Sequence, residues 1–160
     1  MSIIHEMPDH ARIWVYQSIR TFTEQEIAFI SEQLKQFTDQ WAAHGRQLAA
    51  TFSIERDQFI VLAVDESQHQ ASGCSIDASV HVIQHIEQQT GLSLLDKSDV
   101  AYMVGNEVNV RPFTQIKQAV ADGEITADTV IFNNAVQNAG DWKQQWQQVA
   151  SDSWLKRYFA

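Results

Sequence analysis

The sequence is poor in cysteine, proline and glycine: its 160 residues include one, two and six of them, respectively. One cysteine cannot form an internal disulfide, which agrees with a reducing compartment. So few prolines and glycines leave no room for a flexible linker, while 44% hydrophobic residues are typical of a globular chain. We therefore expect a single domain with its own core over residues 1–160.

Basic residues are scarce as well. Eleven Lys and Arg residues stand against 20 Asp and Glu residues, which gives a formal net charge of −9. Such a charge repels phosphate backbones and anionic membrane surfaces, and no run of basic residues counteracts it. The first ten residues lack the regions of a signal peptide, and no stretch reaches the roughly 18 apolar residues of a membrane span. We expect a cytoplasmic protein that binds neither nucleic acid nor membranes.

The motifs of several enzyme classes are missing. The sequence has no G-x-x-x-x-G-K-[ST] phosphate loop, no G-x-G-x-x-G dinucleotide motif, no G-x-S-x-G elbow and no C-x-x-C pair. ATP hydrolysis therefore has no visible machinery, and we predict no cofactor. On balance, these absences favour a protein that is not an enzyme.

Runs of β-branched and aromatic residues predict several strands. They are expected over residues 13–19, 48–56, 59–64, 100–104, 108–111 and 129–132. The second and third should pair as a hairpin, because only a short polar connection separates them. The fourth and fifth flank Gly105-Asn106, and glycine at the first central position is typical of a tight hairpin turn.

Two helices are expected in the first 91 residues. Thr23 and Glu26 have the spacing of a capping box at the start of the first, which Gly45 should end. Apolar residues then recur every three or four positions up to residue 41, which is the pattern of an amphipathic helix. The second helix is expected to begin near Ser75 and to end at Gly91.

Up to about residue 111 the predicted order is strand, helix, strand, strand, helix, strand. This is the order of a ferredoxin-like βαββαβ unit, an antiparallel sheet with both helices on one face. Residues 112–160 are expected to form a C-terminal extension of helix, strand and helix, whose last helix Ser151 to Ser153 would interrupt. The predicted fold class is α+β.

The only cysteine, Cys74, lies close to the predicted start of the second helix, where Ser75 or Asp77 is expected to be the cap. Free N–H groups and the helix dipole favour a nucleophilic thiolate at such a position. One hypothesis is a cysteine-dependent enzyme with Cys74 as nucleophile, His81 or His44 as base and the helix N-terminus as oxyanion donor. Many solitary cysteines are instead buried small hydrophobic residues.

Asp77, His81 and His85 follow one another at steps of four, so they share one face of the predicted helix. Helical geometry turns this face away from the core. Two histidines at this spacing can chelate a metal ion, but Val82 stands where a zinc-protease motif has glutamate. A metal site is therefore a second alternative, and solvated histidines are the simpler interpretation.

The loop between the third predicted strand and the second helix has the polar residues of a binding site. Those that we expect to contact a ligand are Asp65, Glu66, Ser72, Gly73, Ser75 and Asp77. His44, expected in the last turn of the first helix, would face this loop if the sheet edge brings the two together. Our first hypothesis is a non-enzymatic protein that binds a protein partner or a small ligand through the loop 65–77. A homodimer is an open alternative for its assembly.

Four motifs span nearly the whole chain: R-I-W-V-Y-Q-S from Arg12, W-x-A-H-G from Trp41, V-D-E-S-x-x-x-A-S-G-C-S-I-D from Val64 and G-E-I-x-x-D-T-x-x-F-N-N from Gly123. In these the chain resembles a family of short, uncharacterised bacterial proteins that often carry the label "ABC transporter ATPase". The label implies ATP hydrolysis, which disagrees with the missing phosphate loop. The resemblance brings no established activity with it.

Residues 116–132 resemble the part of small GYF-type peptide-binding modules that runs from a helix through G-x-I into a strand. This resemblance implies a protein-interaction role for the last third of the chain. Trp142, Trp146 and Trp154 would then supply anchors for a partner. Packing in the core is the simpler account of all three.

Overall fold

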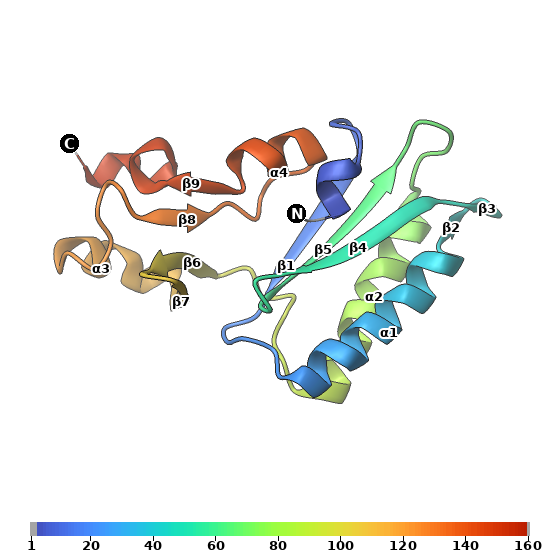
Figure 1. Cartoon of the computed structure of the whole chain (residues 1–160), viewed down its shortest axis with the longest axis horizontal. Helices are drawn as coiled ribbons and strands as arrows, with labels where there is room; N and C mark the ends of the chain where they lie inside the picture. The colour runs from blue at the N-terminus through green and yellow to red at the C-terminus, as the bar shows by residue number, and fades with distance from the viewer. Residues whose placement is uncertain (1–2, 160) are drawn as a thin grey trace.

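The computed structural model describes residues 3–159 and contains antiparallel sheets of three and four strands together with a small two-stranded one (Figure 1). The three-stranded sheet has the order β1-β5-β4 and is formed by β1 (Arg12–Gln17), β4 (Ala49–Glu55) and β5 (Phe59–Asp65). The central strand β5 pairs with a strand on each side, and its side chains are buried because they enter core clusters on both faces of the sheet. The predicted hairpin of residues 48–64 is confirmed.

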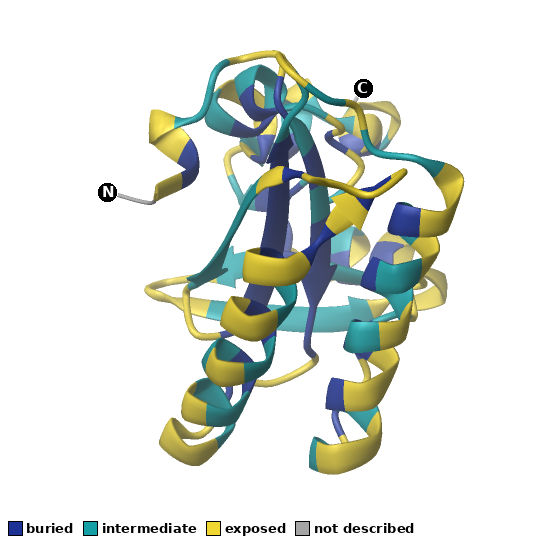
Figure 2. Ribbon diagram, turned by 90° about the vertical axis from the view of Figure 1, so that its right-hand side faces the viewer, coloured by how far each residue is buried: buried dark blue, intermediate teal, exposed yellow. Residues whose placement is uncertain are grey.

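Helices α1 (Glu24–Gln40) and α2 (Gly73–Thr90) cover one face of this sheet, and their outer faces are exposed (Figure 2). Apolar residues of the two helices, at helical spacing, pack against every second residue of the strands, and together they form one core cluster. Its buried members are Tyr16, Phe22, Ile30, Leu34, Ile60, Leu62, Ile83, Ile86, Leu92 and Leu94. We call this sheet with its two helices the N-terminal lobe.

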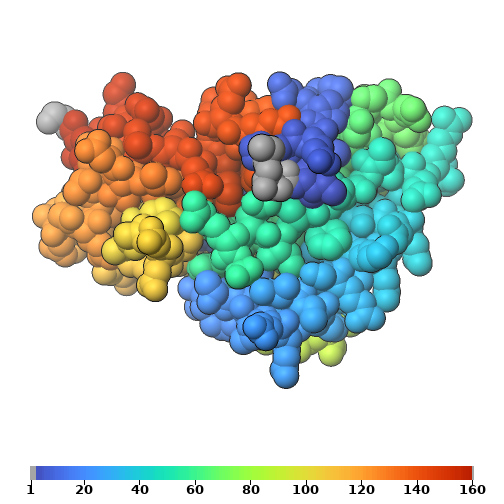
Figure 3. All heavy atoms as spheres, in the orientation of Figure 1, coloured from blue at the N-terminus to red at the C-terminus, as the bar shows by residue number. Residues whose placement is uncertain are grey.

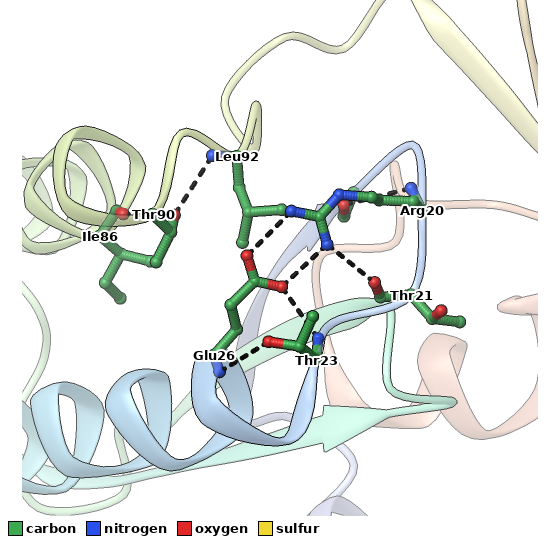
Figure 4. A network of polar contacts seen from close by, with 8 residues as sticks. Arg20, Thr21, Thr23, Glu26, Ile86, Thr90 and Leu92 are labelled. Carbon is green, nitrogen blue, oxygen red and sulfur yellow. Dashed lines mark hydrogen bonds and ion pairs between the residues drawn. The ribbon is translucent and has the colours of Figure 1, made fainter.

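The predicted capping box starts α1 (Figure 4). The Thr23 hydroxyl accepts a hydrogen bond of 3.1 Å from the backbone N–H of Glu26, whose carboxylate accepts one of 2.8 Å from the N–H of Thr23. Arg20 donates two further hydrogen bonds of 2.8 Å to the same carboxylate. At the end of α2, Gly91 adopts the left-handed conformation with φ 75°, as predicted. Both helices thus begin or end where local sequence signals place them.

The end of α1 differs from the prediction. The helix stops at Gln40, and β2 (Ala42–Ala43) pairs with β3 (Arg46–Gln47) across a turn in which His44 and Gly45 have positive φ. The expectation that Gly45 ends the helix, with His44 in its last turn, is therefore wrong. Trp41 leaves the helix in an extended conformation, because its ring packs against Trp14 and Phe37 in a buried cluster.

The four-stranded sheet has the order β7-β6-β8-β9 and belongs to the second half of the chain. It is formed by β6 (Asp99–Val104), β7 (Glu107–Pro112), β8 (Val130–Phe132) and β9 (Gln147–Val149). The hairpin around Gly105 is confirmed, since Val104 pairs with Glu107 across the turn. The strand β9 was not predicted, because its sequence Q-Q-V continues the helical spacing of the two tryptophans before it.

The position of β6 contradicts the ferredoxin-like arrangement. Both edges of β6 are used, one by β7 and one by β8, so β6 is not available to pair with β1. The first sheet keeps three strands in the order expected for three of the four ferredoxin-like strands, and the fold class α+β stands. The expected division after residue 111 falls inside β7 and would split the second sheet.

Short helices complete the second half. They are α3 (Ile116–Ala121) and α4 (Ala139–Gln145), with the 3₁₀ helices η2 (Phe113–Gln115), η3 (Ala150–Asp152) and η4 (Trp154–Tyr158). A further 3₁₀ helix, η1 (Ile3–Glu6), precedes β1. A core cluster that includes Tyr102, Ile116, Ile131 and Leu155 joins α3 and η4 to the outer face of the four-stranded sheet. We call the part from β6 to η4 the C-terminal lobe.

The two lobes share a core on the second face of the three-stranded sheet. Ile13, Val15 and Phe59 pack there against side chains of the C-terminal lobe that include Trp142 and Trp146. The C-terminal lobe therefore lies directly against the N-terminal lobe, as the spheres in Figure 3 show. Among residues 3–159, the helices are too short or too polar for any of them to cross a bilayer.

Candidate functional site

A cavity of about 790 Å³ lies where the two lobes meet, and we call it the interlobe groove. It is lined by residues 12–15 and 17 of β1, residues 94 and 96–100, residues 132–137, and Phe113 and Trp154. Residues 94–98 belong to the connection from α2 to β6, which passes between the lobes in Figure 1. The volume lies within the range of about 300–1,000 Å³ that is usual for ligand pockets.

Amide side chains hold the walls of the groove together. Gln17 Nε2 donates a hydrogen bond of 3.1 Å to the carbonyl oxygen of Asp99, and Asn134 Nδ2 donates one of 2.7 Å to Gln17 Oε1. The indole of the buried Trp146 donates one of 2.9 Å to Asn134 Oδ1. Three segments far apart in the sequence are thereby fixed relative to one another, so the groove is formed before any ligand arrives.

Two exposed aromatic side chains stand at the groove. The rings of Phe113 and Trp154 are stacked with their centroids 5.5 Å apart and their planes at 26°. Phe113 and Trp154 remain 52% and 42% exposed, so each keeps much of its surface open after giving one ring face to the other. The backbone N–H of Phe113 donates to the carbonyl oxygen of Ser98 at 2.9 Å, and the Ser153 side chain caps the start of η4. We call Phe113 and Trp154 the aromatic pair.

Carboxylates border the groove beside the aromatic pair. Asp96 accepts hydrogen bonds from the hydroxyl of Ser98 at 2.6 Å and from its backbone N–H at 2.9 Å. These bonds, the hydroxyl first, lower the pKa of Asp96 below its ordinary value. Asp99 opens β6 and pairs in register with Pro112, the residue directly before Phe113.

The two basic residues of the groove are engaged with other groups. The guanidinium of Arg12 lies 5.0 Å from the ring centre of Trp14 and 3.9 Å from the carboxylate of Glu66, which lies outside the groove. The ammonium of Lys97 lies 5.6 Å from the ring centre of Tyr16, which is part of the helix-covered core. Neither cation forms an ion pair with Asp96 or Asp99.

The predicted loop is held mainly by its own side chains. Asp65 accepts hydrogen bonds from the hydroxyl of Ser67 at 2.6 Å and from its N–H at 3.0 Å, and these bonds lower the pKa of Asp65. Glu66 accepts one of 2.8 Å from the N–H of Ala71. The ring of His69 contacts the carbonyl oxygen of Ala43 at 2.6 Å and anchors the loop to β2. Both predicted acidic residues therefore stabilise the loop conformation.

His44 does face this loop, as the sequence analysis allowed. A shallow depression of about 490 Å³ is lined by His44 and by residues 66–72. His44 reaches it from the turn between β2 and β3 and not from a helix. Of the residues predicted to act together, the depression combines His44 with Glu66 and Ser72, but not with Cys74 or His81.

The start of α2 lies two residues earlier than expected. Ser72 is the N-cap and forms a reciprocal capping box with Ser75, whose hydroxyl accepts from the N–H of Ser72 at 2.7 Å. The expectation that Ser75 or Asp77 caps the helix is therefore wrong. Gly73 and Cys74 occupy the first turn, and Cys74 is exposed rather than buried.

The residues proposed for catalysis or metal binding do not converge. Cys74 and His81 are seven positions apart on the helix, a rise of about 10 Å that exceeds the hydrogen-bond reach of a general base. His81 and His85 are exposed, so the prediction that they face away from the core is confirmed. Within the described chain, no three His, Cys, Asp or Glu side chains are arranged to hold a metal ion, Asp77 with its two histidines included.

The groove itself was not predicted. Its residues come from five separate segments, and no motif marks any of them as part of a site. Two signals were available: Phe113 directly after Pro112, a large apolar residue where a chain turns, and Trp154, which the resemblance to GYF-type modules offered as an anchor for a partner. Of the three tryptophans weighed as anchors, Trp142 and Trp146 are buried in the core, and only Trp154 is exposed. Comparisons of the chain with known protein families, with curated proteins and with solved structures find no match.

Proposed function

We propose that this protein is a non-enzymatic binding protein whose ligand or protein partner docks in the interlobe groove. The observation that carries the proposal is the aromatic pair, because two large apolar rings stay open to solvent beside a preformed cavity. Exposed apolar surface costs free energy unless something covers it, and surfaces of this kind often mark interaction sites. Aromatic residues are also the side chains that most often dominate binding energies.

The polar rim of the groove supports the same function. Apolar area supplies affinity in most ligand sites, while a few fixed polar groups orient the ligand. The groove has such groups in the carboxylates of Asp96 and Asp99 and in the side chains of Asn133 and Asn134. Because Asn134 is held by Gln17 and Trp146, little conformational entropy is lost when a ligand contacts that wall.

The loop depression is the second candidate site. Its support is that His44 lines the same depression as residues 66–72. From the sequence, this was expected only if the sheet edge brings the two segments together. The depression is the weaker candidate, because no Phe, Tyr or Trp side chain lines it to supply apolar contact area. A cytoplasmic location and membership of the bacterial family that the motifs resemble remain predictions. ATPase activity is not part of the proposal.

A fragment-binding experiment distinguishes the two sites. Uniformly ¹⁵N-labelled protein gives indole N–H signals from its five tryptophans, and Trp154→Phe assigns the exposed one. Small aromatic fragments, such as indole and benzamide, are expected to shift the Trp154 signal and not that of the buried Trp41, whose indole bonds to Ser75 outside the groove. Phe113→Ala should remove the shift. Shifts confined to residues 66–72 would instead assign binding to the loop depression and contradict the proposal.

A further inference from the structure

We propose that the groove binds a basic, arginine-containing peptide segment, with the guanidinium of an arginine on the aromatic pair and within reach of the carboxylates beside it. The inference rests on the proposed function and names the class of partner. It combines two features of the same cavity: aromatic faces open to solvent and two carboxylates, Asp96 and Asp99, that form no ion pair with the basic residues of the lining, Arg12 and Lys97.

The aromatic pair fits a planar cation. An aromatic ring carries negative charge on its face, so a cation over the ring is attracted to it, most strongly for tryptophan. Phe113 and Trp154 use one face each for their mutual stacking, and their remaining exposure leaves the outer surface open. A guanidinium is flat and weakly hydrated and stacks on such a surface, whereas a lysine ammonium is compact and holds its water.

The carboxylates supply the second part of the recognition. Asp96 and Asp99 line the same cavity as the aromatic pair, and the hydrogen bond from Phe113 to Ser98 keeps the ring next to this segment. Carboxylates accept paired hydrogen bonds from a guanidinium, which gives geometric selectivity as well as attraction. Arg12 lies near Glu66 and Lys97 lies over Tyr16, so neither cation pairs with the two acidic groups. One oxygen of Asp96, Oδ1, accepts the hydrogen bonds from Ser98, which leaves the other oxygen to face a ligand.

The charge of the whole chain favours the same partner. A formal net charge of −9 attracts basic segments over a distance of about one Debye length and repels acidic ones. The cavity of about 790 Å³ is large enough for an arginine side chain with its flanking backbone, and not for a folded domain. An exposed arginine on a flexible segment of another protein meets these requirements.

The test compares three peptides that differ in one property. They are acetyl-Gly-Arg-Gly-Arg-Gly-amide, its twin with citrulline in place of arginine and its twin with lysine. Citrulline keeps the shape and planarity of arginine but has no charge. We expect the arginine peptide to shift the Trp154 indole signal of the ¹⁵N-labelled protein, the citrulline peptide to bind about tenfold more weakly, and the lysine peptide to lie between them.

Matched variants locate the interaction. Phe113→Ala is expected to weaken arginine-peptide binding by about three- to tenfold, and Asp99→Asn by about threefold. Ile19→Ala is the control for the first, because Ile19 is a 62% exposed apolar residue outside the groove. Asp128→Asn is the control for the second, since it removes the same charge from an exposed position outside the groove. Both controls should leave binding unchanged.

The outcomes separate this inference from the proposed function. Equal binding of the arginine and citrulline peptides would overturn the cationic ligand class, while leaving the groove as a binding site. Failure of the arginine peptide to bind, with neutral aromatic fragments still shifting the Trp154 signal, would do the same. If neither peptides nor fragments reach Trp154, the proposed function fails together with the inference. A loss of arginine binding in Ile19→Ala or Asp128→Asn would also contradict it.

Discussion

The indole nitrogen Nε1 of Trp41 donates a hydrogen bond of 2.7 Å to the backbone carbonyl oxygen of Ser75, 34 residues further along the chain. The bond connects the residue that ends α1 to the first turn of α2, and the indole is almost fully buried. We predict that Trp41→Phe lowers the free energy of unfolding by about 1–3 kcal/mol, through the lost hydrogen bond and the smaller ring. Urea denaturation measures this change.

The control for this variant is Trp154→Phe, which makes the same chemical change at an exposed position without that bond. It should alter the free energy of unfolding by no more than about 0.5 kcal/mol. Equal effects of the two substitutions would show that the bond between the two helices contributes nothing.

A pH-dependent contribution to stability is predicted at Glu26 (Figure 4). The hydrogen bonds from Arg20, followed by those within the capping box, lower the pKa of Glu26 from 4.5 to about 2. The folded pKa lies below the unfolded one, so the stabilisation is complete above about pH 4.5 and is lost as the pH falls through about 2. Glu26→Gln keeps an oxygen for the capping box and should cost about 0.5–1 kcal/mol at pH 7.

Denaturation of both proteins at a series of pH values measures this contribution. The difference in unfolding free energy between wild type and Glu26→Gln should shrink steadily as the pH is lowered from about 5 to 2. A difference that is the same at every pH would mean that the charge of Glu26 does not contribute.

The opposite pH dependence is predicted at Tyr102. Its buried hydroxyl donates to Glu124 at 2.7 Å and accepts from Arg111 at 3.0 Å, and burial, followed by the bond to Glu124, raises its pKa. A folded pKa above the unfolded value of 10.0 gives stability that is complete below pH 10 and is lost as the pH rises through the raised pKa. Tyr102→Phe should therefore cost about 1–2 kcal/mol at pH 7.

Alkaline unfolding followed by circular dichroism is the measurement. Tyr102→Phe should lose less stability than the wild type between neutral pH and about pH 11. Some loss remains in the variant, because burial also raises the pKa of Tyr16, which both proteins contain. An unchanged alkaline profile would contradict the prediction for Tyr102.

Binding and stability are expected to separate at the aromatic pair. Phe113→Ala removes a side chain that is 52% exposed, so the free energy of unfolding should change by no more than about 1 kcal/mol. Fragment binding in the groove should nevertheless be lost. Calorimetric titration together with thermal denaturation of the same sample tests both. A large loss of stability would show that the pair holds the fold and is not a binding surface.

The variant Cys74→Ser tests whether the loop 65–77 takes part in binding. Because the thiol is exposed in the first turn of α2, we expect an alkylating reagent to modify the folded protein. Cys74→Ser should leave stability within about 0.5 kcal/mol and fragment binding within about twofold of the wild type. Loss of fragment binding in this variant would indicate that the ligand binds at the loop 65–77 instead of the groove.

Local structure was predictable wherever neighbouring residues determine it. The spacing of Thr23 and Glu26, the glycine at position 91 and the Gly105 turn each act within a few residues, and all three are confirmed. The exposed row of His81 and His85 followed equally well from helical geometry. These features need no knowledge of which segments meet in space.

The errors concern contacts between distant segments. Gly45 has the conformation that would end a helix, but α1 stops earlier because Trp41 packs onto Trp14 and bonds to Ser75. The order of elements along the chain suits β6 as a fourth strand beside β1. Both edges of β6 instead pair with other strands, β7 and β8. Strand pairing depends on partners elsewhere in the chain, which the pattern of one strand does not specify.

The candidate site illustrates the same limit. Residue types typical of chemistry gather in the loop 65–77, but Asp65 and Glu66 bond within the loop, and Ser72 caps α2. The groove is lined by common residue types, and only their arrangement in the fold makes them a candidate site. Phe113 and Trp154 are 41 positions apart, and only the folded chain brings their rings together.

The most direct test of the groove as the binding site is a search for intermolecular nuclear Overhauser effects between ¹³C,¹⁵N-labelled protein and the unlabelled arginine peptide. The structure predicts contacts from the side-chain protons of the arginine to the ring protons of Phe113 and Trp154. Contacts to His44 or His69 of the loop depression instead, or to neither site at saturating peptide, would contradict the account.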